Sequence, residues 1–98
     1  MIFELEPVRR DKRGKEIFDY VVRDFYEKMS EELLEAHATA CDTHPQAVTE
    51  EIKELLDLMT VCATRISVIL PDQMYFLSEL QEEIITRNKA RGYFDVDD

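Results

Sequence analysis

Residues 31–35 read Glu-Glu-Leu-Leu-Glu, and residues 54–57 repeat the motif in shorter form as Glu-Leu-Leu-Asp. Both stretches lie inside helical patterns. In each, two acids stand three positions apart, Glu32 with Glu35 and Glu54 with Asp57. Side chains at positions i and i+3 share one face of a helix, with Cβ atoms about 5–6 Å apart. Each pair of acids is therefore spaced to bind one metal ion.

The two acid pairs are placed symmetrically about one point of the chain. The midpoint of Glu32 and Asp57 and the midpoint of Glu35 and Glu54 both fall between residues 44 and 45. If two antiparallel helices meet there, Glu35 faces Glu54 and Glu32 faces Asp57 at matching heights. We expect these four carboxylates to converge with no Lys or Arg among them. Like charges at that distance repel unless a hard divalent cation lies between them. The spacing predicts a Mg²⁺ site, with Mn²⁺ as the alternative ion.

The composition favours one small all-α domain over residues 1–98. Glu, Leu and Ala are abundant, the chain holds only two Gly and three Pro, and no long alternating run suggests a sheet. The net charge of −10 argues against binding of nucleic acid through a broad basic surface. Two cysteines without a CxxC spacing, and no signal peptide or apolar run of membrane length, indicate a reduced, cytoplasmic setting without a membrane partner.

The hydrophobic pattern predicts an antiparallel helical hairpin followed by a third helix. We expect an irregular lead-in over 1–14, helices over about 14–42 and 45–68, a third helix over about 71–90, and an acidic tail at 95–98. Both faces of the second helix carry apolar residues, so we expect its own chain to cover one face and a partner subunit the other. A core of the four-helix-bundle type would then form on oligomerisation.

Glu32 lies within the apolar stripe of the first helix, and Glu35 lies on its flank. A carboxylate on a buried face is costly unless something pairs with it, and this favours a functional role for Glu32. The apolar stripe consists of Phe18, Val21, Val22, Phe25, Met29, Leu33 and Ala36.

Each of these features also has an ordinary structural interpretation. Acids at i and i+3 are common on solvated helix faces, and the basic run over 9–14 is typical of a solvated loop, with phosphate contact as the alternative.

Cys41 and His44 have a C-x-x-H spacing, but a zinc site needs about four ligands. The remaining candidates, His37 and Cys62, are out of register, so the spacing does not favour zinc.

The acid motifs, the interval of 18 residues between them and the closing stretch 88–94 (Asn-Lys-Ala-Arg-Gly-Tyr-Phe) together resemble the MazG-like all-α nucleoside triphosphate pyrophosphohydrolases. The branch similar to phosphoribosyl-ATP pyrophosphohydrolase is the nearest in pattern, since Val-Arg-Arg-Asp-Lys at 8–12 is similar to its Val-Arg-Asp-Lys start. The lead-in differs from that pattern by one extra Arg, and Tyr93 stands where a second Gly is common.

This resemblance implies Mg²⁺-dependent cleavage of the α–β phosphoanhydride of an NTP or dNTP, giving a monophosphate and pyrophosphate, in house-cleaning or control of the nucleotide pool. The four paired acids would hold the metal, and Glu31 would be the catalytic, water-activating acid of an outer shell. Lys89 and Arg91 would contact the substrate phosphates, with Asn88 as a partner. The family works as homodimers or homotetramers.

A second class of function is a non-enzymatic acidic helical adaptor or inhibitor, acting as a mimic of nucleic-acid charge. Its main argument is the charge of −10 on 98 residues. Hydrolysis of nucleotides in the presence of Mg²⁺ separates the two classes.

Overall fold

The computed structural model describes residues 5–70 and 74–95. Helices dominate this part of the chain, and no β-strand forms within the two ranges, so the predicted all-α class is confirmed. No helix in them is long and apolar enough to cross a membrane. In chain order the elements are a short 3₁₀ turn, Ile17–Asp19, and three α-helices, α1 Val22–Ala40, α2 Ala47–Ile69 and α3 Met74–Ala90.

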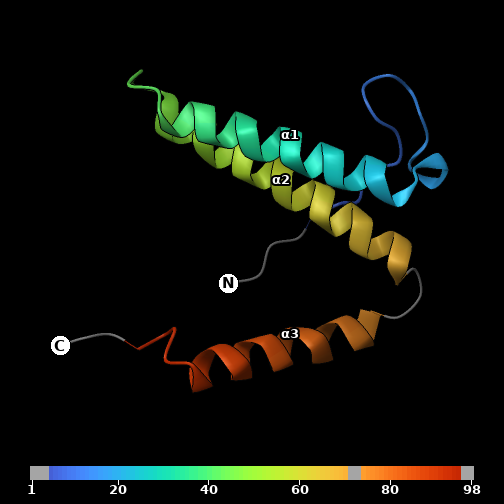
Figure 1. Cartoon of the computed structure of the whole chain (residues 1–98), viewed down its shortest axis with the longest axis vertical. Coiled ribbons are helices and arrows are strands. Elements are labelled where there is room, and N and C mark those ends of the chain that lie inside the picture. The colour runs from blue at the N-terminus through green and yellow to red at the C-terminus, as the bar shows by residue number, and fades with distance from the viewer. Residues whose placement is uncertain (1–4, 71–73, 96–98) are drawn as a thin grey trace.

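Helices α1 and α2 form an antiparallel hairpin along which they pack closely (Figure 1). The chain reverses over residues 41–46, as the sequence predicts. Side chains hold this reversal, because Asp42 accepts a hydrogen bond from the backbone N–H of His44, and His44 Nδ1 accepts one from that of Gln46. The expected start of α2 at Pro45 was wrong by two residues. Gln46 is the N-cap residue of α2, and its side chain makes no capping hydrogen bond.

The first helix begins at Val22, so the expected start near Gly14 was wrong. Residues 10–16 form a closed loop instead, in which Arg10 and Glu16 make an isolated antiparallel bridge and Gly14 has a φ of +84°. Glycine adopts that left-handed conformation without a steric penalty. At the helix start, Asp24 accepts a hydrogen bond of 2.9 Å from the backbone N–H of Val21, which satisfies a donor that a helix N-terminus leaves free.

The small core lies between α1, α2 and the segment before α1. Phe25 is only 1% exposed, and its ring makes an edge contact with Tyr20 at 5.1 Å between centroids. The lead-in is tied to α2 by a hydrogen bond of 3.0 Å from the N–H of Val8 to Oγ1 of the buried Thr64. The predicted apolar stripe of α1 was too broad, because Phe25 and Ala36 are buried but Phe18, Val21, Val22 and Leu33 are exposed.

Helix α3 stands apart from the hairpin (Figure 1), and α1 with α2 is the only extensively packed helix pair in the described ranges. The radius of gyration of 16.2 Å exceeds the roughly 13 Å of a compact domain of about 100 residues. At the end of α3, Gly92 has a φ of +74°, and Tyr93 donates a hydrogen bond back to the carbonyl of Asn88. Gly92 thus occupies the left-handed position just past the helix end, where glycine is favoured. The expected helix start at residues 71–73 and the last three residues of the tail lie outside the described residues.

Candidate metal centre

Three acids meet where the middle of α1 faces the first half of α2. Glu32, Glu54 and Asp57 each place one carboxylate oxygen within 4.8 Å of the others. Burial decreases across the group, because Glu32 is 6% exposed, Glu54 is half-buried and Asp57 is exposed. The cluster thus has a buried end in the hairpin and an open end toward solvent, as a site that exchanges a ligand requires.

Glu35 adjoins the cluster through Glu54. Burial raises the pKa of Glu54 above its ordinary value of 4.5, and a hydrogen-bonding contact with Glu35 and the negative charges of Glu35, Asp57 and Glu32 raise this pKa further. The structure therefore brings all four acids predicted from the mirrored spacing to one region, with Glu35 at its exposed edge. Burial is the largest cause of the raised pKa, and the neighbouring negative charges, which a cation would offset, add to it.

Two carboxylate oxygens of the cluster lack a hydrogen-bond partner. Oε2 of Glu32 and Oε2 of Glu54 are both inaccessible to solvent, and neither has a partner within the described part of the chain. Buried polar atoms in proteins are almost always paired, because an unpaired one costs about 1–3 kcal/mol. These two atoms are thus placed as ligand atoms would be.

Lys28, which is not among the predicted site residues, contacts the acid cluster. Its Nζ lies 2.9 Å from Oε1 of Glu32 and 3.5 Å from Oε2 of Glu31. The expectation that no Lys or Arg would lie among the acids was therefore wrong. The spacing of four residues between Lys28 and Glu32 predicts this contact, because such residues are neighbours on one helix face. One ammonium still leaves the four acids with a net negative charge.

The donor set fits a hard divalent cation. Each atom of the cluster that could bind a metal is a carboxylate oxygen, and carboxylate oxygens are the ligands that Mg²⁺ and Ca²⁺ prefer. The unpartnered oxygen of the nearly buried Glu32 gives the cluster a coordination site that an ordinary solvated acidic face does not have. Soft metals are disfavoured, since Cys41 is exposed in the reversal and Cys62 lies farther along α2.

The other predicted site residues lie outside this cluster. Glu31 is not one of the three clustered acids, and its side chain is 61% exposed and pairs with Lys28. Asn88 and Lys89 occupy the last turn of α3 and Arg91 follows it, where the Arg91 guanidinium lies over the Tyr93 ring at 5.9 Å. Because α3 does not pack extensively on the hairpin, a single chain does not bring these three residues to the acids.

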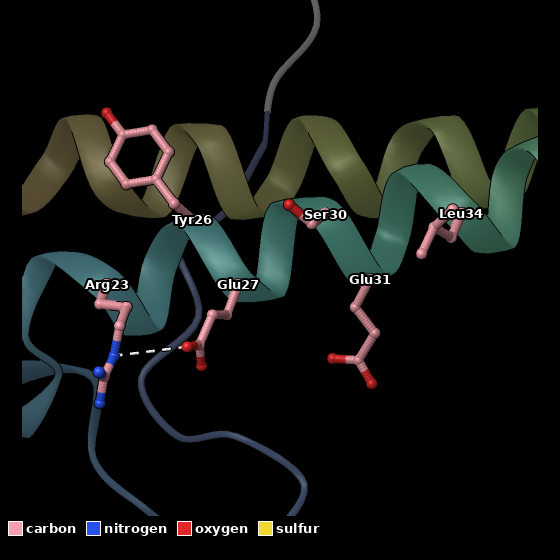
Figure 2. Close-up of a pocket in the computed structure, with 6 residues that line it drawn as sticks. All are labelled: Arg23, Tyr26, Glu27, Ser30, Glu31 and Leu34. Atoms are coloured by element: carbon pink, nitrogen blue, oxygen red, sulfur yellow. Dashed lines mark ion pairs between the residues drawn. The ribbon is translucent and has the colours of Figure 1, made fainter.

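Two hollows adjoin the first half of α1. One is an open hollow of about 540 Å³ along the solvent side of the helix, lined by Arg23, Tyr26, Glu27, Ser30, Glu31 and Leu34 (Figure 2). The other is a polar pocket of about 370 Å³ between α1 and the loop over residues 10–16. The basic run of that loop predicts a solvated loop or a phosphate contact, and it does not predict a pocket.

The fold and the cluster define an all-α protein with a group of carboxylates between two antiparallel helices. Comparison with protein-family models, with curated proteins and with solved structures gives no match.

Proposed function

We propose that this protein is a Mg²⁺-dependent nucleotide pyrophosphohydrolase of the MazG-like kind, which cleaves the α–β phosphoanhydride of an NTP or dNTP. The observation that carries the proposal is the nearly buried Glu32, whose Oε2 has no partner in the described residues and which lies beside Glu54 and Asp57 of the opposite helix. The order of the sequence motifs supports the same family. The reaction yields a nucleoside monophosphate and pyrophosphate.

In this proposal Glu32, Glu35, Glu54 and Asp57 hold the cation. The bound ion would neutralise charge on the phosphates and lower the pKa of the attacking water. Glu31, exposed and one turn of helix from Glu35, accepts the proton of that water. The water oxygen forms a bond to the α-phosphorus, the bond to the bridging oxygen breaks, and pyrophosphate leaves with the electron pair.

The proposal includes a homodimer or homotetramer, in which a second copy covers the hairpin. Large apolar side chains that are 39–56% exposed support it, because a single chain leaves them in contact with water. In such an assembly, Asn88, Lys89 and Arg91 of one copy contact the phosphates bound by the acids of another. The exposed apolar residues of α2 and α3 in this range are Ile52, Leu55, Ile66, Val68, Ile69, Phe76, Ile84 and Ile85.

The test is hydrolysis of a panel of NTPs and dNTPs with and without Mg²⁺, with monophosphate and pyrophosphate as the measured products. Glu54→Gln is expected to abolish turnover and the Mg²⁺-dependent rise in Tm. Glu50→Gln is the matched control, because Glu50 is exposed one turn earlier on α2 and pairs only with Lys53 in the described residues. Absence of products across the panel, together with a Tm that Mg²⁺ does not raise, overturns the proposal and favours the acidic adaptor.

A further inference from the structure

The polar pocket beside α1 adjoins the acid cluster through Lys28, which lines the pocket and contacts Glu32. Its walls include Lys12, Arg13 and Lys15 of the loop and Lys28 and Glu31 of α1. Figure 2 shows the carboxylate of Glu31 on the side of α1 along which the N-terminal loop runs. The volume of about 370 Å³ lies within the range of small-molecule sites.

The loop is held in place by the side chain of Asp11. This carboxylate accepts hydrogen bonds of 2.9 Å from the backbone N–H groups of Arg13 and Lys15 and one of 2.8 Å from the hydroxyl of Tyr20. The hydrogen bond from Tyr20 is the main cause that lowers the pKa of Asp11. Because the Tyr20 ring packs on the buried Phe25, the loop is fixed to the core of the hairpin.

The pocket lining holds four acids and four bases, and two of the bases have no ion-pair partner in the described residues. Lys12 and Arg13 form no ion pair in the described ranges, and they lie in the loop whose backbone N–H groups at Arg13 and Lys15 donate hydrogen bonds to Asp11. The pocket acids, in contrast, all have partners: Asp11 binds the loop and Tyr20, Asp24 binds Lys15, Glu27 binds Arg23 and Glu31 binds Lys28.

We propose that this pocket binds the phosphate chain of the substrate, with Lys12 and Arg13 as phosphate contacts. The inference rests on the proposed function for the identity of the substrate. Lys28 joins the two sites, because it lines the pocket and its Nζ lies 2.9 Å from Glu32 of the acid cluster. A short polyphosphate in the pocket therefore lies next to the cation site. The net charge of −10 repels long polyanions, so the ligand is a small phosphate ester rather than a nucleic acid.

Inorganic tripolyphosphate is the probe, and its binding is measured by calorimetry in the presence of Mg²⁺. The double substitution Lys12→Gln with Arg13→Gln is expected to weaken binding at least about tenfold, because a hydrogen bond to a charged group is worth about that factor or more. Lys53→Gln removes a similar exposed charge from α2, away from the pocket, and is expected to leave the affinity unchanged. Equal affinity of the double variant and the wild type overturns the pocket assignment.

Nucleotide hydrolysis by the same variants separates this inference from the proposed function. A KM raised at least about tenfold in the Lys12→Gln, Arg13→Gln variant, with Lys53→Gln unchanged, supports the pocket. Turnover with an unchanged KM in the double variant overturns the pocket and leaves the pyrophosphohydrolase in place. Binding of tripolyphosphate that depends on Lys12 and Arg13, without hydrolysis of any nucleotide, supports the pocket as an anion site and overturns the pyrophosphohydrolase.

Discussion

Replacement of Glu32 by Met should stabilise the metal-free protein while it abolishes the response to Mg²⁺. Glu32 is 6% exposed, one of its oxygens is buried without a partner in the described residues, and Glu54 and Asp57 lie beside it. Met has a similar length, carries no charge and adapts its shape to irregular gaps. The substitution thus removes a destabilising group from the hairpin and removes a metal ligand at the same time.

The size of this effect follows from two opposing contributions. An unpaired buried oxygen costs about 1–3 kcal/mol, and this cost disappears in Glu32→Met. The ion pair with Lys28 is lost, but the Lys28 side chain is 25% exposed and keeps Glu31 as a partner, so the loss is at most about 1 kcal/mol. The net gain is about 0–3 kcal/mol, and each kcal/mol raises the Tm of a domain of this size by about 4–8 °C.

Urea and thermal unfolding in EDTA and in Mg²⁺ measure both effects. For the wild type, Mg²⁺ at ten times its Kd is expected to add about 1.4 kcal/mol, and for Glu32→Met it is expected to add nothing. Glu31→Met is the control, because that side chain is 61% exposed; it should change stability by less than about 0.5 kcal/mol and keep the Mg²⁺ response. A loss of more than about 1 kcal/mol in metal-free Glu32→Met would refute the reasoning and make Glu32 a structural ion-pair residue.

Three further outcomes follow from the same structure. Phe25→Ala should lower the free energy of unfolding by about 3–5 kcal/mol in a urea titration, because its ring is 1% exposed and packs on Tyr20. Because the folded-state pKa of Glu54 is raised above 4.5, protonation favours the folded state, so the Tm of the metal-free protein should fall as pH rises from 4.5 through that pKa. Glu54→Gln should remove this fall, and an unchanged pH profile in the variant contradicts the assignment. Asp11→Asn should raise the KM for nucleotide while the Mg²⁺-dependent rise in Tm persists, since Asp11 holds the loop and lies outside the acid cluster.

The acid cluster could be predicted from the sequence because helical geometry converts spacing into position. Two antiparallel helices that reverse over residues 41–46 place positions equidistant from the reversal at similar heights, so Glu32, Glu35, Glu54 and Asp57 come together whatever packs around them. The start of α1 could not be predicted in the same way. The apolar pattern continues back to Phe18, but the Asp11 carboxylate binds backbone N–H groups of the loop, and side-chain bonds of this kind compete with a helix.

The position of α3 is not fixed by extensive packing on the hairpin within the described ranges. Its apolar residues recur at helical spacing, so the helix itself is readily predicted, yet Phe76, Ile84 and Ile85 are 39–47% exposed. An apolar stripe on a helix favours packing against another surface, but the stripe alone does not identify that surface. The acids and the pocket loop, in contrast, are fixed within one chain by α1, α2 and the Tyr20–Phe25 contact. The single chain thus assembles the proposed cation and phosphate sites by itself, and the proposed second copy adds Lys89 and Arg91.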